Sequence, residues 1–375
     1  MKVAIVHDYL HEVGGAEGVV NAIWELFPKA DIYSATCDKK ALDKAGILNG
    51  AKIFYPKWKD SIPGKFKNFL HKVLIANLPF YFSNLNLSKY DLIISSTAHF
   101  AKGVKTEKGK QIHISYIHTP SRFLYGFEGE IRKRSLWYWR ILLFPLDSFL
   151  RVMDQKFAKN PDYLICNSKT VQDRIKKFYR RDATIIYPFP EVTVSEKDFK
   201  KAIEKKGQYF LVISRLAQYK NIDLIIKACG EKNILLKIAG KGPAFERYQE
   251  LAKNYKSVEL LGFVSDVMRS NLYTNCSVSL HAVKDEDFGM APLETMMYGK
   301  PVIAYKQGGF LETVNSEVGV FFEELNVKSI QNAINKFEKI EFNPEKIRNH
   351  ALSFSKENFK IKFIKFVEMA VKDLD

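Results

Sequence analysis

The chain is built from short apolar runs separated by amphipathic stretches, and this alternation leaves few folds open to it. Apolar runs of four to six residues are typical of buried strands, and the stretches between them are typical of helices. Strands that alternate with helices predict an α/β fold with parallel sheets. We expect strands at residues 2–7, 32–35, 91–95, 112–117 and 163–166, and again at 209–214, 234–239, 258–261, 277–280, 301–305 and 318–322.

The alternation starts afresh after residues 185–190, which read Ile-Ile-Tyr-Pro-Phe-Pro. Pro188 and Pro190 exclude a helix there and make a stiff crossing, and a length of 375 residues suits two domains. We therefore predict two doubly wound domains, residues 1–190 and 191–375. Ligands bind at the carboxyl ends of the strands in such sheets, so we expect a central cleft faced by both sets of strand ends.

Simpler features exclude several classes of protein. No apolar run reaches the ~18 residues of a membrane-spanning helix, and Asp8 comes too early for the apolar core of a signal peptide. The cysteines lack a CxxC spacing and lie mostly in apolar runs, which indicates reduced packing residues of a cytoplasmic protein. The histidines show no metal-ligand spacing, so we predict no metal site. The cysteines are Cys37, Cys166, Cys229 and Cys276.

The net charge of +16 is distributed unevenly along the chain. Residues 1–190 contain 30 Lys and Arg against 17 Asp and Glu, whereas the remainder contains 28 against 25. Such an asymmetry predicts that the first domain alone meets a negatively charged partner. Nucleic acid, an anionic lipid surface and a phosphorylated substrate all meet that description.

Two segments combine basic and aromatic residues in a way that suits a lipid headgroup layer. These are residues 52–82 and residues 131–153. Each also suits an amphipathic helix whose aromatics pack on the core, and this second interpretation stays open. A single-stranded nucleic-acid groove is disfavoured because no nucleic-acid fingerprint accompanies the aromatics. The residues predicted to face a membrane are Lys57, Trp58, Lys59, Lys65 and Lys67.

Glycines follow the first predicted strand, in the sequence Gly14-Gly15-Ala16-Glu17. Glycine allows the backbone to approach a ligand closely, and the helix that follows offers free N–H groups to a phosphate. The pattern is not G-x-G-x-x-G, which disfavours a nicotinamide cofactor. A tight turn between strand and helix without any ligand is the alternative.

The strongest group of candidate site residues lies within residues 284–309. Glu286 falls in the loop after a predicted strand, and Glu294 falls in the first turns of the next helix. The backbone N–H groups of Gly289, Met290 and Ala291 point to the same space and form an anion site. A ligand with hydroxyls at both ends and phosphate in the middle fits this arrangement, and a nucleotide sugar has that layout. The alternatives are a solvated loop for Glu286 and an exposed helix position for Glu294.

The acidic residues of this segment are also compatible with two other kinds of chemistry. Asp285 and Asp287 form a D-x-D pair that could hold Mg²⁺ or Mn²⁺ on a diphosphate, but their place just before a helix in the second domain argues against it. Nothing indicates the facing carboxylates of a hydrolase. Fixed cations can replace a metal, and Arg215 and Lys220 follow the strand at 209–214 as such a clamp. Lys220 could also be a solvated residue at a helix start.

The order of these motifs resembles that of retaining glycosyltransferases of family 4. The resemblance rests on Gly14–Glu17, on residues 116–122 (Tyr-Ile-His-Thr-Pro-Ser-Arg), on Arg215 with Lys220, and on Glu286 with Glu294. It runs nearly end to end and implies the GT-B fold, in which a last helix at about 354–374 can cross back to the first domain. Residues 214–226, 260–273 and 286–314 are especially similar to bacterial O-antigen and exopolysaccharide mannosyltransferases.

The resemblance implies a role for each matching residue. Arg215 and Lys220 would hold the donor diphosphate, and Glu294 would bind the nucleotide ribose. Glu286 would bind the transferred sugar, and His118 would line the pocket beside it, although a structural histidine at a turn is the alternative. The implied catalytic residues are His118, Arg215, Lys220 and Glu286, and the implied donor-binding residues are Gly14, Gly15, Arg215, Lys220, Glu286, Phe288, Gly289, Met290, Ala291 and Glu294.

The resulting hypothesis is a retaining hexosyltransferase that uses a nucleotide sugar and needs neither a metal nor another cofactor. Mannose from GDP-mannose is the first choice of donor, and the acceptor is a lipid-linked saccharide in polysaccharide synthesis at the inner face of the cytoplasmic membrane. Residues 281–284 depart from the family pattern, which leaves the donor sugar open. A UDP-sugar-dependent transferase, a nucleotide-sugar epimerase of the same fold and a non-catalytic binding protein remain as alternatives.

Overall fold

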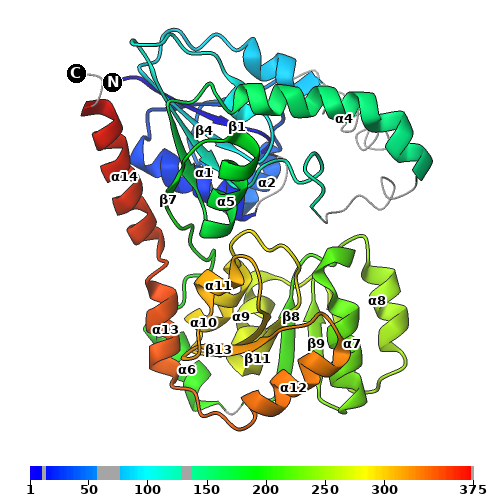
Figure 1. Cartoon of the computed structure of the whole chain (residues 1–375). Helices are drawn as coiled ribbons and strands as arrows, with labels where there is room; N and C mark the ends of the chain where they lie inside the picture. Colours follow the sequence, from blue (N-terminus) through cyan, green and yellow to red (C-terminus); the bar gives the residue numbers. More distant parts are fainter. Residues whose placement is uncertain (11–13, 57–76, 128–136, 206, 373–375) are drawn as a thin grey trace. The chain divides into compact units, whose positions relative to one another are not determined.

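A computed structural model describes residues 1–10, 14–56, 77–127, 137–205 and 207–372. They form two compact units, each with its own parallel sheet (Figure 1). Unit 1 contains the described residues up to 127, those at 137–188 and those at 356–372, and unit 2 contains residues 189–355. The chain thus leaves unit 1 after Pro188 and returns to it for its last helix.

Unit 1 is built on a seven-stranded parallel sheet. Its strand order is β3-β2-β1-β4-β5-β6-β7, so the chain starts in the middle of the sheet and builds outward on both sides. This reversal of direction at β1 and β4 is the feature that places ligands at the carboxyl ends of doubly wound sheets. The strands are β1 Val3–His7, β2 Asp31–Ser34, β3 Ile53–Phe54, β4 Leu92–Thr97, β5 Ile112–Ile117, β6 Tyr163–Cys166 and β7 Thr184–Ile185.

Unit 2 has a six-stranded parallel sheet in the order β10-β9-β8-β11-β12-β13. Its direction reverses between β8 and β11, which are hydrogen-bonded neighbours although more than 60 residues separate them in the chain. The loops after these two strands therefore emerge side by side. The strands are β8 Tyr209–Ile213, β9 Leu236–Ala239, β10 Val258–Gly262, β11 Cys276–His281, β12 Val302–Tyr305 and β13 Gly319–Phe322.

Several helices begin where the sequence offers a capping side chain. Ser168, Ser195, Ser265, Asn326 and Asn343 each accept a hydrogen bond from a backbone N–H in the first turn of the helix that follows. The helices of unit 1 are α1 Gly15–Leu26, α2 Lys39–Ala45, residues 77–83, α4 Trp137–Phe157, α5 Lys169–Tyr179 and α14 Lys356–Lys372, with the short turn η2 Ala101–Gly103. Those of unit 2 are α6 Glu196–Glu204, α7 Ile222–Glu231, α8 Phe245–Ala252, α9 Asp266–Asn275, α10 Met290–Met297, α11 Phe310–Thr313, α12 Val327–Phe337 and α13 Pro344–Leu352, with the short turn η4 Gln218–Lys220.

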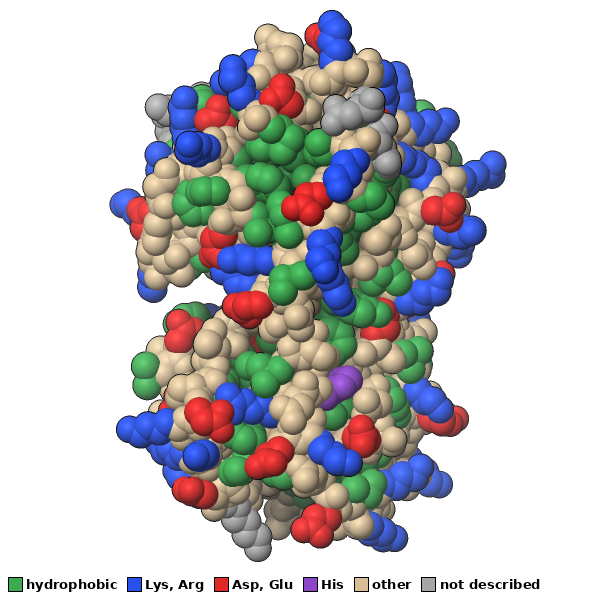
Figure 2. Space-filling view, turned by 90° about the vertical axis from the view of Figure 1, so that its left-hand side faces the viewer, with side chains coloured by type: hydrophobic (Ala, Val, Ile, Leu, Met, Phe, Trp, Pro, Cys, Tyr) green, Lys and Arg blue, Asp and Glu red, His purple; other side chains and the backbone are tan. Residues whose placement is uncertain are grey.

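The last helix, α14, packs on unit 1. Its buried side chains include Phe359 and Phe363, and the ring of Phe359 lies 5.9 Å from that of Tyr116 on β5. Lys356 bonds to Glu25 of α1 at 2.6 Å. Figure 2 shows the face of the molecule that carries α14, where hydrophobic side chains gather in the middle of the upper unit, which is unit 1, and Lys and Arg side chains lie toward its edges.

The predicted α/β class with two parallel sheets is confirmed, and the observed strands agree with the expected ones to within two residues at either end. The sequence analysis missed the two-residue strands β3 and β7 at the edges of the first sheet. β3 and the helical residues 77–83 lie at the described ends of the segment 52–82, and Leu78 and Phe82 are buried in the unit 1 core. Among the described residues, no helix is both long and apolar enough to cross a bilayer.

Candidate functional site

The loops after β8 and β11 bring two of the predicted site residues of unit 2 together. Lys220 Nζ lies 3.1 Å from Glu286 Oε2, although the two residues are 66 positions apart in the sequence. The side chain of Lys220 is 19% exposed and that of Glu286 20% exposed, so the pair is open to solvent on one side. A cation paired in this way can move its hydrogen bonds to an anionic ligand without leaving a buried charge unpaired.

The backbone around Glu286 is held by the turn that follows β12. The Gly309 N–H donates to the Glu286 carbonyl at 2.9 Å. A Cβ atom at residue 309 would lie 2.2 Å from the Cα of Phe288, so only glycine allows this approach. The turn after β12 thus holds the backbone of the Glu286 loop, and the Glu286 carboxylate contacts Lys220.

The α10 helix begins directly after this loop. Gly289 has a φ of 95° and precedes the first helical residue, Met290, without a side-chain cap. Phe288 is buried and its ring packs 5.7 Å from that of Phe354. The first N–H groups of α10 thus follow Glu286 within a few residues, and the anion site at Gly289, Met290 and Ala291 stays a prediction.

Glu294 lies inside unit 2, among other polar groups. The Tyr273 hydroxyl donates to its Oε2 at 2.7 Å. Burial raises the pKa of Glu294, and the hydrogen bonds from Tyr273 and from the Glu191 N–H, together with the charge of Arg269, partly offset that rise. Glu294 is therefore not the exposed helix glutamate that the sequence left as an alternative.

A neutral histidine, to which the sequence assigned no role, lies near the Lys220–Glu286 pair. His281 is buried at the end of β11, and its Nε2 lies 2.8 Å from the Ser279 hydroxyl. Burial and the neighbouring charge of Lys220 lower the pKa of His281 to about 3. Asn221 follows Lys220 and donates to the Ala282 carbonyl at 2.9 Å, which ties the β8 loop to the β11 loop.

Arg215 lies on the turn directly after β8, and its side chain is exposed. The backbone of this turn is held by hydrogen bonds to the loop after β9, from the Leu216 N–H to the Lys241 carbonyl at 2.9 Å. Arg215 is thus on the same sheet edge as Lys220, as predicted, but belongs to the outer surface of the unit.

In unit 1, His118 stands at the end of β5, and polar groups hold it on two sides. Its Nε2 lies 2.8 Å from the Ser96 hydroxyl, and its carbonyl accepts a hydrogen bond from Asn167 at 2.8 Å. Burial and the nearby His7 lower the pKa of His118 to about 4, so the ring is neutral at physiological pH.

The glycines after β1 belong to a helix start that is also tied to a histidine. Gly14 is the N-cap of α1, its N–H donates to Glu17 Oε2 at 3.0 Å, and Gly15 begins the helix. The other Glu17 oxygen lies 3.6 Å from His7 Nε2, while His7 Nδ1 lies 2.8 Å from the Ser96 carbonyl. Burial opposes the charge on His7, but Glu17 and Asp8 outweigh it and raise the pKa of His7.

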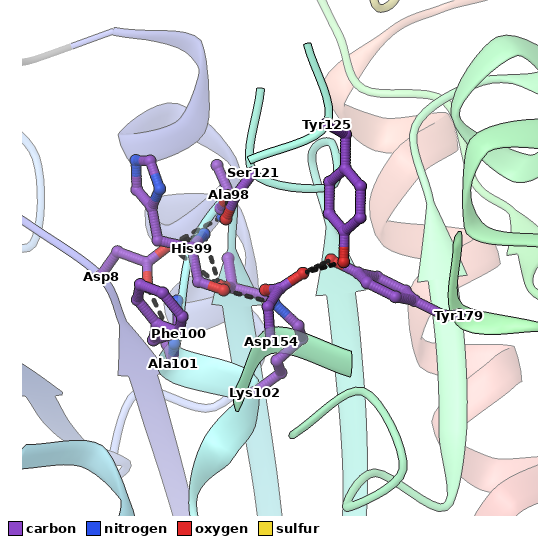
Figure 3. A network of polar contacts seen from close by, with 11 residues as sticks. Asp8, Ala98, His99, Phe100, Ala101, Lys102, Ser121, Tyr125, Asp154 and Tyr179 are labelled. Atoms are coloured by element: carbon purple, nitrogen blue, oxygen red, sulfur yellow. Dashed lines mark hydrogen bonds and ion pairs between the residues drawn. The ribbon is translucent and has the colours of Figure 1, made fainter. Parts of the chain in front are cut away.

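Asp8, the residue after β1, is the centre of a cradle that sequence reasoning missed (Figure 3). Its buried carboxylate accepts five hydrogen bonds of 2.7 to 2.9 Å from the segment at the end of β4. Burial opposes ionisation, but the charges of His99 and His7 and the Ala101 N–H outweigh it and lower the pKa of Asp8. The donors are the Thr97 hydroxyl and the N–H groups of Ala98, His99, Phe100 and Ala101.

A buried ion pair continues this network toward α4 (Figure 3). Lys102 Nζ lies 2.5 Å from Asp154 Oδ1, and both side chains are fully buried. Lys102 also donates to the His99 carbonyl. The hydroxyls of Tyr125 and Tyr179 both donate to Asp154 Oδ2, each at 2.8 Å. Every oxygen of the carboxylate is thus bonded, as a buried charge requires.

Some predictions fall beyond these observations. Lys57, Trp58, Lys59, Lys65 and Lys67 lie outside the described residues. Within the residues that the structure does describe, no group of three His, Cys, Asp or Glu side chains could hold a metal ion.

Residues 193–354, which lie in unit 2, match the family model described as Glycosyl transferases group 1. The alpha-1,3/1,6-mannosyltransferase ALG2 of Yarrowia lipolytica is 26% identical over 378 residues, a match that covers 85% of this chain and 80% of that protein. The GPI3 subunit of phosphatidylinositol N-acetylglucosaminyltransferase of Saccharomyces cerevisiae is 28% identical over 230 residues, which is 57% of this chain and 47% of the subunit.

Solved structures share the fold across almost the whole chain. Anabaena Alr3699/HepE in complex with UDP and glucose gives a TM-score of 0.69 at 19% identity and covers 98% of this chain and 99% of that one. The lipopolysaccharide outer core galactosyltransferase WaaB gives a TM-score of 0.67 at 18% identity and covers the same shares. The two-unit fold is that of the GT-B glycosyltransferases. The match to the model of group 1 glycosyl transferases covers nearly the whole of unit 2.

Proposed function

We propose that the protein is a retaining glycosyltransferase that moves a hexose from a nucleotide diphosphate sugar to a lipid-linked saccharide acceptor. The observation that carries the proposal is the Lys220–Glu286 pair at the carboxyl edge of the unit 2 sheet, next to the start of α10. Mannose from GDP-mannose is the first choice of donor because the ALG2 relatives are named mannosyltransferases. UDP-glucose is the alternative, since Alr3699/HepE was solved with it.

In this mechanism Lys220 and Glu286 exchange partners when the donor binds. Lys220 and Arg215 contact the diphosphate and neutralise the charge that develops on the leaving phosphate. Glu286, released from Lys220, accepts hydrogen bonds from hydroxyls of the sugar, and Glu294 accepts them from the ribose. A leaving-phosphate oxygen then takes the proton of the acceptor hydroxyl as it attacks on the same face of the sugar, so the reaction needs neither a metal nor a separate base.

The acceptor half of the proposal rests on unit 1. His118 is neutral and held by Ser96, so it can contact an uncharged sugar without repelling or attracting the phosphates. The basic excess of residues 1–190 suits a saccharide carried by a lipid diphosphate at an anionic membrane. We therefore propose that the protein works at the cytoplasmic face of the membrane as a peripheral enzyme.

Replacing Lys220 by Met tests the proposal. Transfer by K220M should fall by ~10²- to 10³-fold because the leaving phosphate loses a fixed cation. Donors are first ranked by the rise in melting temperature with GDP-, UDP- and ADP-sugars, since a matched ligand stabilises the folded state. The control is K227M, which removes an exposed lysine from α7 and should transfer sugar normally.

Three outcomes would contradict the proposal. Full transfer by a folded K220M protein would exclude the site, and loss of activity in EDTA that Mn²⁺ restores would favour a metal at Asp285 and Asp287. Conversion of the donor sugar without any acceptor would instead identify an epimerase.

A further inference from the structure

The outer side of α4 has large apolar side chains that stay exposed among the described residues. Phe144 is 65% exposed, Phe149 42% and Val152 63%. Phe80, from the helical residues 77–83, is 51% exposed, and its ring stacks on that of Phe149 with centroids 6.2 Å apart. We call these four residues the α4 face. Exposed apolar side chains that adjoin in this way mark an interaction surface.

The charges around the α4 face indicate the kind of partner. At ~100° per residue, Phe144, Val152 and Phe149 span about 140° of the helix circumference. Arg151 and Lys156 are exposed on the same helix. Among the described side chains of α4, the acidic ones turn away from solvent: Asp154 is buried and Asp147 is half-buried. Lys156 falls within this sector and Arg151 lies ~20° outside it, so exposed apolar side chains and cations share one side of the helix, as is typical of a helix that lies in the plane of a lipid interface.

The helix is anchored strongly enough to present this face as a rigid surface. Asp154 sits on the opposite side of α4 and binds Lys102 of η2, with Tyr125 and Tyr179 on its second oxygen. Leu150 and Phe157 are buried on the same inner side. In Figure 1, α4 extends outward from the strands of the unit 1 sheet, and its amino-terminal end lies farthest from them.

We propose that the α4 face inserts into the headgroup layer of an anionic lipid bilayer and docks unit 1 on it. Charge complementarity supports this partner, because residues 1–190 have a net charge of +13 and the exposed charges of α4 itself are positive. The inference deepens the proposed function, because a lipid-linked acceptor resides in such a bilayer. It assigns the contact to the second of the two basic and aromatic segments, residues 131–153, most of which lies in α4, whereas Lys57, Trp58, Lys59, Lys65 and Lys67 lie outside the described residues.

The test is co-sedimentation of the full chain with phosphatidylcholine vesicles that contain about 30% phosphatidylglycerol. The double variant Phe144→Ser, Phe149→Ser should bind at least about tenfold more weakly, because two aromatic side chains no longer enter the interface. Lys156→Glu should weaken binding at low salt and have less effect at high salt. The matched control is Ile361→Ser, Met369→Ser, which changes two exposed apolar residues of α14 and should bind normally.

Other outcomes would overturn the proposal that the α4 face binds lipid. Unchanged binding by the Phe144/Phe149 variant, or equal loss in the α14 control, would overturn the proposal. A dimer in sedimentation velocity that only the Phe144/Phe149 variant loses would assign the α4 face to a second copy of the chain instead. Transfer to a water-soluble acceptor separates this inference from the proposed function, because the α4 variant should retain that activity even when vesicle binding is lost.

Discussion

At the scale of single residues, unit 1 depends on charges that are buried and fully bonded. Asp8 takes five donors from residues 97–101, and Asp154 takes one lysine and two tyrosines. A buried carboxylate of this kind is destabilising unless each oxygen is bonded, so its donors and acceptors act as one unit. Asp8 thereby fixes the turn that leads from β4 to Lys102, and Lys102 fixes α4.

Replacing Asp8 by Asn should lower the free energy of unfolding of unit 1 by about 3 kcal/mol, because an amide group would face N–H donors that now bond a carboxylate. All four tryptophans fall within the first 190 residues, so urea unfolding followed by tryptophan fluorescence reports on this unit. Since the folded state lowers the pKa of Asp8, its contribution is present above the ordinary value of 3.8 and is lost as the pH falls below it.

The difference in stability between wild type and D8N should therefore be full at neutral pH and shrink toward about pH 3. An equal difference in stability at neutral pH and at about pH 3 would mean that the size and shape of the Asp8 side chain, rather than its charge, stabilise the unit. Thr97→Val serves as the comparison, because it removes one of the five donors and leaves the carboxylate in place.

At the scale of elements, the candidate site of unit 2 lies on the loops after β8 and β11, and hydrogen bonds between neighbouring loops hold them in place. The loop after β11 carries Glu286, the turn after β12 supports it through Gly309, and Asn221 ties it to the loop after β8. The strands determine where these loops begin, and hydrogen bonds between the loops determine where their side chains point. Gly289 is the joint at which the supported loop becomes helix α10.

Gly289→Ala should weaken donor binding more than about tenfold and destabilise unit 2 by ~1–3 kcal/mol. The positive φ strains any L residue there, and the new Cβ would lie 2.8 Å from the Phe310 ring. Gly262→Ala is the matched control, since Gly262 also has a positive φ but its Cβ would meet nothing closer than 3.8 Å. Calorimetric titration with the nucleotide sugar compares the two variants, and similar losses in both would show that backbone strain, rather than the fit of the loop, sets the affinity.

At the scale of the whole molecule, the chain closes its first unit with its last helix. Phe359, Phe363, Val367 and Ala370 of α14 are buried, and Lys356 bonds to Glu25 of α1. The first unit is therefore composite, made from segments at either end of the sequence, whereas the described residues of unit 2 all fall between 189 and 355. A change near residue 360 should act on the unit that begins at residue 1.

Phe363→Ala should destabilise unit 1 by about 3–5 kcal/mol through the cavity it leaves. Tryptophan fluorescence should report this loss, while binding of the nucleotide sugar by unit 2 should persist at urea concentrations that unfold unit 1. Ile361→Ala, an exposed position of the same helix, should change the stability by less than about 0.5 kcal/mol. Loss of donor binding in step with the fluorescence change would show instead that the two units unfold together.

Features that depend on neighbouring residues could be predicted from the sequence, and features that depend on residues far apart in it could not. Strands such as β5 and β6 are predictable because their apolar runs are local. Lys220 and Glu286 were each predicted from motifs. Their contact was not predicted, because it depends on β8 and β11 being neighbours in the sheet, which the order of strands along the chain does not reveal. The role of Asp8 was not predicted because four of its five donors are backbone N–H groups some 90 residues away. Backbone donors leave no signal in the amino-acid sequence. The role of Asp154 was not predicted either, because its partner Lys102 is 52 residues away in the sequence.

The return of α14 to unit 1 has a consequence for the order in which the protein is made. The ribosome releases residues 1–188 early, but the apolar surface that α14 covers, including the ring of Tyr116, stays bare until residues 356–372 emerge. Unit 2 is complete before then and can fold by itself. The nascent chain therefore passes through a stage in which unit 2 is complete while unit 1 still exposes the apolar surface that α14 will cover. A chain that terminates before residue 356 would leave unit 1, rather than unit 2, open to aggregation.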